Sequence, residues 1–395
     1  MTSSQNSHPL TLLEWFSTTA PPSHGIPSIL LLDGGVSTHL EHLIAPQTFS
    51  HRELWSSSLL LTQEGREYIK QGHADWLLAG SDILTTVTYQ CHFGLVGTGS
   101  NNDNESDVGT VVSKETMSKM IRQGIEIARD AIYQQVASKK SSITRSVGPF
   151  VVASTGPYGA AMADGSEYSG KYPLNVTEQA LLQFHRQKAA GLWGCHPDGI
   201  AVETIPNLQE VGVVCQVLRE LKQRKTHQSP CCCWISLACQ DGTRLNDGSL
   251  LKDALDIIQS MDSNNEFITA IGVNCCDSVH IAPLVKTIAQ HIFSCCKRDV
   301  APRGIVVYPN SGESWDAANE EWKEGTGVDN AQFADRLIEV VSIIHDTWKK
   351  RRLEFEGPIC APKILLGGCC RTSQRTIATL RNRVDTMQDK FLIKE

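Results

Sequence analysis

The sequence lacks the features that would place a protein in a membrane, in an export pathway or on a nucleic acid. No uninterrupted apolar run approaches the ~20 residues needed to cross a bilayer. Residues 1–9 are polar and have neither the charged start nor the apolar centre of a secretory signal. The formal net charge is -7, and there is no lysine- or arginine-rich run of the kind that a nucleic-acid or anionic-membrane partner would need. We therefore predict a cytoplasmic protein that binds neither membranes nor nucleic acids.

Two further absences narrow the fold and the cysteine chemistry. No Gly-x-Gly-x-x-Gly follows the first predicted strand, which argues against the dinucleotide-binding form of an open α/β sheet. Without an export signal, the fourteen cysteines are better interpreted as thiols in a reducing compartment than as disulfides. The composition, with 41% hydrophobic and 20% charged residues, is typical of a globular protein. The length of 395 residues is enough for one large barrel or for two to three ordinary domains.

Short apolar runs that end in polar residues recur along the chain. The first run begins at Ile29 and ends on Asp33 and two glycines, which is the pattern of a strand buried on both faces whose end opens into a loop. Eight runs of this kind predict strands, at residues 29–33, 82–86, 150–154, 199–203, 232–238, 269–273, 304–308 and 363–367.

Segments with helical periodicity lie between these runs. Apolar residues step by three or four positions from Ile281 to Ile292 and from Phe333 to Trp348, so each set forms one stripe. Further helices are predicted at residues 62–79, 113–137, 177–193, 208–224, 249–261 and 373–387. Eight strand-helix units predict a single (β/α)8 TIM barrel over residues 29–395, with an open doubly wound sheet as the structural alternative.

Two segments fall outside the repeating units. Residues 1–28 predict an N-terminal extension, a polar leader followed by a short helix from Leu10 to Phe16 that covers one end of the fold. The polar stretch from Gly97 to Gly109 predicts a surface insertion. No interdomain linker is recognisable elsewhere, so we expect an extension and one barrel domain.

Two of the predicted strands are followed closely by cysteine. Cys369 and Cys370 come after the last run, and Cys275 comes after the sixth. A catalytic zinc takes three protein ligands, favours thiolate sulfur and keeps one position open. These three thiols could provide such a site, but cysteine is also a common small residue in protein cores. Their spacing leaves both interpretations open, because it is not that of a paired Cys-x-x-Cys site.

The C-terminal ends of barrel strands carry the reacting groups in enzymes with this fold. Asp33 and Thr86 lie there, and either could equally stabilise a turn. Glu203 is harder to explain in that way, because a carboxylate that closes an apolar strand needs a cationic or hydrogen-bonding partner, such as the amino group of an amino acid. The full set at the strand ends is Asp33, Thr86, Ser154, Glu203, Asn274, Cys275, Tyr308, Cys369 and Cys370. We interpret the cysteines at 231–233, 276, 295 and 296 as packing residues.

Together these motifs resemble those of the homocysteine S-methyltransferases, zinc enzymes built on a single barrel. The matching stretches run in order along the chain: Leu32-Asp-Gly-Gly35, Thr86-Val-Thr-Tyr-Gln90, Thr155-Gly-Pro-Tyr-Gly159, Ala163-Asp-Gly-Ser-Glu-Tyr168, Glu203-Thr204, Gly272-Val-Asn-Cys275, Tyr308-Pro-Asn-Ser-Gly-Glu313 and Gly367-Gly-Cys-Cys-Arg371. The Gly-x-Asn-Cys and Gly-Gly-Cys-Cys signatures are the most specific. The resemblance implies that Cys275, Cys369 and Cys370 bind Zn²⁺. It also implies that the amino-acid end of homocysteine is held by Asp33, Gly34, Thr86 and Glu203.

The resemblance further implies a small-molecule methyl donor. Family members that use S-methylmethionine or S-adenosylmethionine typically have Arg-Thr after the double cysteine, as at Arg371 and Thr372, whereas betaine-dependent members differ there. The expected reaction is transfer of a methyl group from the sulfonium to the homocysteine thiolate, which forms methionine without a general acid or base.

Three alternatives to this reaction remain open. They are a betaine-dependent enzyme, a non-catalytic zinc- or thiol-sensing barrel in which Cys276 closes the metal site, and a barrel lyase or aldolase. The last is disfavoured because no Schiff-base lysine stands at a strand end. The sequence predicts nothing about the oligomeric state.

Overall fold

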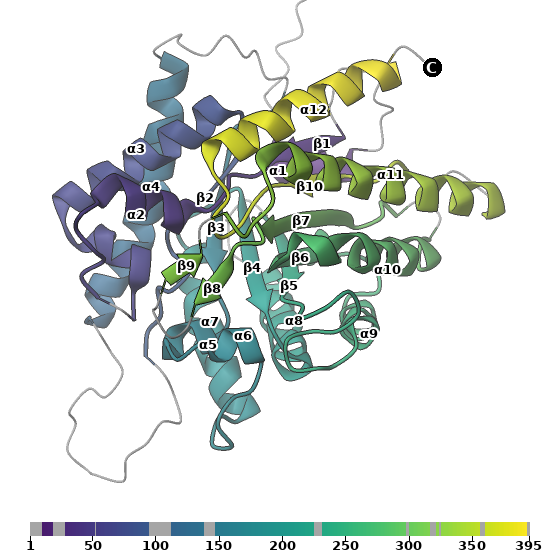
Figure 1. The fold of residues 1–395 in the computed structure, drawn as a ribbon. Coiled ribbons are helices and arrows are strands. Elements are labelled where there is room, and N and C mark those ends of the chain that lie inside the picture. Colours follow the sequence, from purple (N-terminus) through teal and green to yellow (C-terminus); the bar gives the residue numbers. More distant parts are fainter. Residues whose placement is uncertain are drawn as a thin grey trace, which may run out of the picture.

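The chain folds into a barrel of eight parallel strands surrounded by helices (Figure 1). The computed structural model describes residues 10–18, 28–51, 53–94, 112–137, 147–224, 231–297, 300–316, 321–323, 325–355 and 360–392. The barrel strands are β1 (Ile29–Leu31), β2 (Ile83–Thr85), β3 (Phe150–Thr155), β4 (Gly199–Ile205), β5 (Cys232–Leu237), β6 (Ala270–Asp277), β7 (Gly304–Asn310) and β10 (Ile364–Leu366). Their spatial order is β1-β10-β7-β6-β5-β4-β3-β2, so strands adjacent in sequence are neighbours in space. This order confirms the (β/α)8 barrel rather than the open sheet.

Two carboxylates join β1 to β2, where the barrel closes. At the start of the seam, Asp82 N donates a hydrogen bond to Leu31 O at 2.7 Å, and Leu31 N donates to the Asp82 carboxylate at 2.8 Å. At its end, the Thr85 N–H and hydroxyl donate to the Asp33 carboxylate at 2.7 and 2.9 Å. Side chains therefore supply much of the hydrogen bonding between these two three-residue strands.

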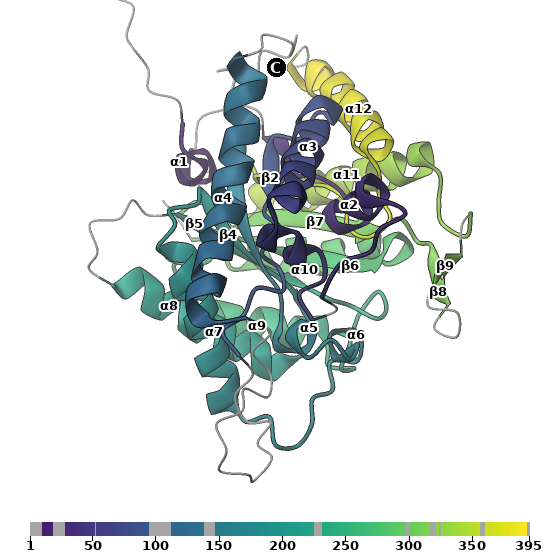
Figure 2. The same cartoon turned by 90° about the vertical axis from the view of Figure 1, so that its left-hand side faces the viewer.

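Amphipathic helices cover the outside of the barrel (Figure 2). The stripes predicted over residues 281–292 and 333–348 pack against the hydrophobic core, because their apolar residues recur on one face; Trp348 at the end of the second stripe is only partly buried. The main helices are α2 (Val36–Ile44), α3 (Gln63–Ala79), α4 (Lys114–Ala137), α7 (Glu178–Trp193), α8 (Leu208–Gln223), α9 (Leu251–Met261), α10 (Ile281–Ser294), α11 (Asn330–Glu354) and α12 (Gln374–Leu392). Across the described residues, the helices are too short or too polar to cross a bilayer.

The short helix α1 (Leu12–Ser17) closes the N-terminal end of the barrel. Thr11 and Glu14 form a capping box that starts the helix. Leu12, Trp15 and Phe16 are buried in a cluster with residues from the starts of the barrel strands. The predicted covering helix is therefore confirmed, while the domain boundary at residue 28 stays a prediction. The insertion expected at 97–109 lies outside the described residues.

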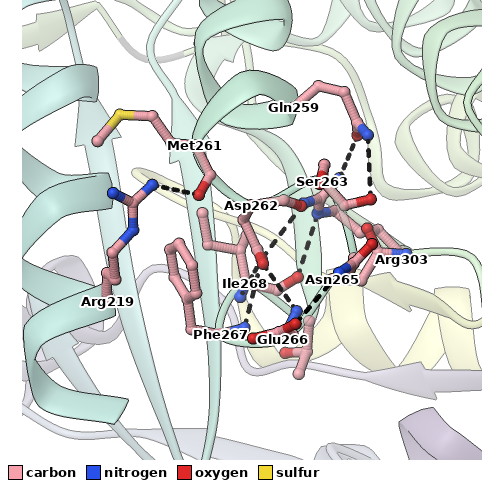
Figure 3. Close-up of polar contacts among 12 residues, drawn as sticks. Arg219, Gln259, Met261, Asp262, Ser263, Asn265, Glu266, Phe267, Ile268 and Arg303 are labelled. Atoms are coloured by element: carbon pink, nitrogen blue, oxygen red, sulfur yellow. Dashed lines mark hydrogen bonds and ion pairs between the residues drawn. The ribbon is translucent and has the colours of Figure 1, made fainter. Parts of the chain in front are cut away.

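A buried ion pair fixes the loop that leads into β6 (Figure 3). The Asp262 carboxylate lies 3.2 Å from the Arg303 guanidinium, and both side chains are almost fully buried. Arg303 also donates to the Gln259 side chain at 2.6 Å. The same carboxylate accepts hydrogen bonds from the backbone N–H groups of three loop residues, Glu266, Phe267 and Ile268. This network anchors the start of β6, the strand that carries Cys275 near its other end.

Candidate metal and substrate site

One cavity at the C-terminal mouth of the barrel collects every polar residue predicted at a strand end. Its volume is about 280 Å³. The nine residues lie in or shortly after every barrel strand except β5. Ser236 of β5 is not among the lining residues, but its hydroxyl donates a hydrogen bond to Asn274 at 2.9 Å. The nine are Asp33, Thr86, Ser154, Glu203, Asn274, Cys275, Tyr308, Cys369 and Cys370. Residues up to 337 positions apart are thus brought to one site, because parallel strands end at the same face.

The three predicted metal-binding thiols lie close together in this cavity. Cys275 Sγ is 3.9 Å from Cys370 Sγ, and the sulfurs of Cys275, Cys369 and Cys370 all lie within 4.8 Å of one another. Ligands 2.3 Å from a tetrahedral zinc would be about 3.8 Å apart. The donor set therefore fits a soft metal ion. Within the described ranges, no other three His, Cys, Asp or Glu side chains are placed closely enough to share an ion.

A backbone irregularity in β6 turns Cys275 into the cavity. The pairing of β6 with β7 shifts register between Asn274 and Asp277, and Cys275 has a φ of +51°. Such a bulge redirects a side chain, and positive φ is uncommon for a residue other than glycine. The next residue, Cys276, is 3% exposed and packs in the hydrophobic core behind the strand. Cys276 therefore points away from the thiol cluster, as predicted.

Close packing shapes the turn after β10 that carries the other two thiols. A Cβ atom on Gly368 would lie 2.2 Å from the Thr372 hydroxyl, so only glycine fits there. Cys369 N donates to Pro309 O at 2.8 Å, and the Thr372 hydroxyl donates to Cys369 O at 2.7 Å. Arg371 forms an ion pair with Glu313 from the loop after β7. The turn is thus tied to the neighbouring strand on both sides of the cysteines.

Glu203 is buried, lines the cavity and accepts a hydrogen bond from the Ser154 hydroxyl. Burial raises the pKa of Glu203 to about 7. The following residue, Thr204, has a φ of +64° and is held by Asn274. The Asn274 side chain accepts from Thr204 N at 2.8 Å and donates to the Thr204 hydroxyl at 2.9 Å. The Gly-x-Asn-Cys motif therefore couples the strand of Cys275 to the strand of Glu203.

The other residues predicted to bind substrate also have contacts within the protein. Burial raises the pKa of Asp33 to about 8 even though Thr85 donates to both of its oxygens, and the charge of Glu203 raises it further. The Thr86 hydroxyl accepts from Ser154 N at 3.2 Å. A Cβ atom on Gly34 would lie 2.6 Å from the Trp76 ring. All three residues line the cavity, and these contacts also account for their residue types without a substrate.

Several large side chains without a predicted role also line the cavity. Trp55 lies in the short 3-10 helix of residues 55–61, Tyr89 in the loop after β2, and Glu167 and Tyr168 in α6 (Ser166–Ser169). Tyr89, Glu167 and Tyr168 belong to two of the motifs that resemble the methyltransferase family. Those motifs contained the signal for these residues, but they lie outside the barrel strands, where strand periodicity assigns no direction to a side chain.

A parallel barrel with three convergent thiols and two buried carboxylates at its mouth defines a class of protein: a TIM-barrel enzyme with a candidate soft-metal centre and a polar substrate cavity. Comparison with known proteins identifies the family. The family model described as homocysteine S-methyltransferase matches residues 30–384. The chain therefore belongs to the homocysteine S-methyltransferase family, a family of methyltransferase enzymes, and the resemblance inferred from the motifs is confirmed.

Individual relatives are similar over nearly the whole chain. Homocysteine S-methyltransferase 2 of Zea mays is 32% identical over 365 residues, 91% of each protein. Selenocysteine Se-methyltransferase of Brassica oleracea var. italica is also 32% identical, over 91% of this chain and 90% of that protein. The crystal structure of the metallated form of the homocysteine methyltransferase MmuM from Escherichia coli superposes with a TM-score of 0.65 at 25% identity, covering 93% of this chain and 100% of that one.

Proposed function

We propose that this enzyme transfers a methyl group from a sulfonium donor, S-methylmethionine or S-adenosylmethionine, to the thiol of homocysteine and so forms methionine. We also propose that Cys275, Cys369 and Cys370 hold the Zn²⁺ that activates this thiol. The convergence of the three thiols within 4.8 Å is the observation that carries the proposal. The names of the relatives support homocysteine as the acceptor, and the metallated form of the Escherichia coli structure supports a metal.

Three thiolate ligands fit a catalytic rather than a closed metal site. Zinc, when bound, supplies Lewis-acid stabilisation that keeps a coordinated thiol deprotonated near neutral pH. A catalytic zinc retains one position for substrate, whereas a structural zinc is closed by four ligands. Cys276, the fourth cysteine considered for a sensing protein, is buried in the core away from the cluster. This placement favours an enzyme over a non-catalytic zinc or thiol sensor.

The chain's own residues would bind and orient the acceptor. We assign the amino-acid end of homocysteine to Asp33, Gly34, Thr86 and Glu203. Asp33 and Glu203 are buried acids with raised pKa values, and a substrate ammonium group would stabilise their charged forms. Methyl transfer breaks one C–S bond as another forms and moves no proton from the thiolate. The protein therefore contributes by positioning the substrates and excluding water, and no general acid or base is assigned.

The donor assignment rests on the Arg-Thr pair after the double cysteine, which resembles the sulfonium-dependent members of the family. Arg371 pairs with Glu313, and Gly35 N donates to the Thr372 hydroxyl at 3.0 Å. Both residues therefore stabilise the turn that presents Cys369 and Cys370. The Arg-Thr pair thus also shapes the turn that carries two of the three candidate metal-binding thiols. A cytoplasmic location stays a prediction.

A donor assay combined with a metal count tests the proposal. Purified protein is supplied with homocysteine and, in separate reactions, with S-methylmethionine, S-adenosylmethionine or betaine, and bound zinc is measured. We expect methionine from a sulfonium donor and about one zinc per chain, the number that one three-thiolate site would hold. Transfer from betaine alone would contradict the donor assignment. Zinc coordination that stays closed when homocysteine is added would favour the sensor.

Substitution of one thiol tests the metal ligands directly. Cys369→Ser is expected to lose zinc and methyl transfer together, because serine replaces a soft thiolate by a hydroxyl group. Cys195→Ser is the matched control, since Cys195 is a half-buried thiol at the end of α7 outside the cluster. Full zinc occupancy in the Cys369 variant would remove Cys369 from the ligand set.

A further inference from the structure

Glu167 is an acid in the cavity whose carboxylate has an unused hydrogen-bonding atom. Its Oε2 atom is buried and has no hydrogen-bond partner among the described residues. Burial raises the pKa of Glu167 to about 7, and the charge of Asp164 adds to this effect. A buried acceptor without a donor is unfavourable in a folded protein, so such a group at a binding cavity commonly marks the position of a ligand donor.

The loop that carries Glu167 is held in place by contacts that do not involve its carboxylate. Asn246 donates from its side chain to Glu167 O at 2.9 Å, and Asn207 donates to Gly170 O at 3.1 Å. Tyr172, at the end of the loop, donates its hydroxyl hydrogen bond to Glu210. Glu210 is fully buried and also lies 2.7 Å from His185 Nε2. The fold therefore presents the Glu167 side chain to the cavity from an anchored backbone.

Glu167 comes from a different element from the two acids assigned to homocysteine. Asp33 and Glu203 interact electrostatically with each other, at the ends of β1 and β4. Glu167 belongs to α6, which lies on the other side of the barrel mouth from β1 (Figure 1). Its charge acts on Tyr89 from the loop after β2, whose pKa is raised by burial and further by the charges of Glu167 and Cys275. The cavity thus has a third carboxylate, which comes from a different element from the acids of the acceptor site.

Methyl transfer requires two amino-acid substrates in the cavity at once, and each carries an ammonium group. The donor also carries a sulfonium charge, but a sulfonium has no hydrogen to donate, whereas an ammonium group donates three. The sulfonium charge disappears in the reaction, so a carboxylate beside it would stabilise the substrate more than the transition state. The ammonium charge persists throughout. A carboxylate paired with the ammonium group therefore strengthens binding without slowing the reaction.

We propose that Glu167 binds the α-ammonium group of the methyl donor and makes the enzyme selective for sulfonium compounds that are also amino acids. This inference rests on the proposed function, because it concerns the donor half of the same cavity. It assigns the carboxylates that line the cavity to the two substrates, Asp33 and Glu203 to the acceptor and Glu167 to the donor.

Steady-state kinetics of Glu167→Gln test the assignment. We expect the KM for S-methylmethionine to rise about tenfold to a hundredfold, the usual effect of losing a hydrogen bond to a charged group. The KM for homocysteine should stay within about twofold, and kcat at saturating donor should change little. Glu339→Gln is the charge-matched control, because Glu339 is exposed on α11 and is not among the residues that line the cavity. Thermal melting checks that both variants remain folded.

A donor without an ammonium group separates the two cationic ends. Dimethylsulfoniopropionate, tested as substrate or as competitor of S-methylmethionine, should bind wild type and Glu167→Gln with equal affinity within about twofold. An equal loss for both donors would assign Glu167 to the sulfonium, and a selective rise in the homocysteine KM would assign it to the acceptor. Either result, or unchanged KM values for both substrates, would overturn the inference. Absence of any transfer from sulfonium donors by the wild type would instead overturn the proposed function itself.

Discussion

Glu203 is a buried acid whose negative charge is not balanced by an ion pair among the described residues. Its carboxylate is 8% exposed and accepts from the Ser154 hydroxyl, while no basic side chain forms an ion pair with it among the described residues. Hydroxyl groups can solvate a buried carboxylate only in part, so its pKa is raised. A substrate ammonium group would supply the missing positive charge. The residue is therefore better explained by binding than by folding.

Removal of this charge should weaken acceptor binding selectively. Glu203→Gln is expected to raise the homocysteine KM about tenfold to a hundredfold, because a charge-assisted hydrogen bond is replaced by a neutral one. The zinc content should not change, since the three thiols are untouched. Glu339→Gln, an exposed substitution on α11, is the control for loss of one negative charge. An unchanged homocysteine KM in Glu203→Gln would remove Glu203 from the acceptor site.

At the scale of the elements, the short helix α1 contributes large apolar side chains to the hydrophobic core. It has six residues, too few for independent stability, yet its apolar side chains fill the N-terminal opening of the barrel. Trp15 is 0% exposed, and the Lys363 ammonium group lies 5.1 Å from the centre of its ring. A Cβ atom on Gly304, the first residue of β7, would lie 2.5 Å from the Phe16 ring, so a larger residue there would clash with this helix.

Removal of a large buried side chain from this helix should destabilise the barrel and leave the residues of the cavity unchanged. Trp15→Ala is expected to lower the free energy of unfolding by about 3 to 5 kcal/mol, the usual cost of removing a buried indole ring. Tyr133→Ala on α4 should change it by less than about 0.5 kcal/mol, because Tyr133 is 75% exposed. Urea unfolding measures both. Similar small effects for the two variants would show that α1 does not contribute to the core.

For the molecule as a whole, one buried histidine should contribute to the pH dependence of stability. His73 in α3 is 1% exposed, and neither ring nitrogen has a hydrogen-bond partner among the described residues. Burial lowers its pKa from 6.5 to about 4. Between these values the unfolded chain binds more protons than the folded one, so stability is full above pH 6.5 and falls as the pH drops towards 4. The difference corresponds to about 3 kcal/mol.

Comparison of unfolding at two pH values tests this contribution. His73→Phe removes the titrating group and keeps an aromatic ring, so the loss of unfolding free energy from pH 7.5 to pH 5.0 should be about 2 kcal/mol smaller than in wild type. His42→Phe is the control, because His42 is exposed on α2. An identical pH dependence in wild type and the His73 variant would show that His73 does not titrate with folding.

Most of the main elements of the fold were predictable because their patterns are local, but α2 was not predicted. The apolar stripe from Ile281 to Ile292 became α10, and the run at 304–308 became most of β7. The small elements were not predictable: α5 (Tyr158–Met162), α6 and the hairpin of β8 (Ser314–Asp316) with β9 (Glu321–Lys323). These segments are too short for a periodic pattern to emerge, and their conformations depend on neighbouring loops.

The sequence by itself determined the eight strand-helix units and the identity of the residues at the strand ends. Each of these follows from apolar periodicity and from the order of residues along one segment. Only the tertiary structure decided which residues meet in the cavity and which way they point. The bulge at Cys275, the positive φ of Thr204 and the anchored loop of Glu167 arise from contacts between strands and loops distant in the sequence. No local pattern encodes such contacts, because their free energy depends on partners that are brought together only when the barrel closes.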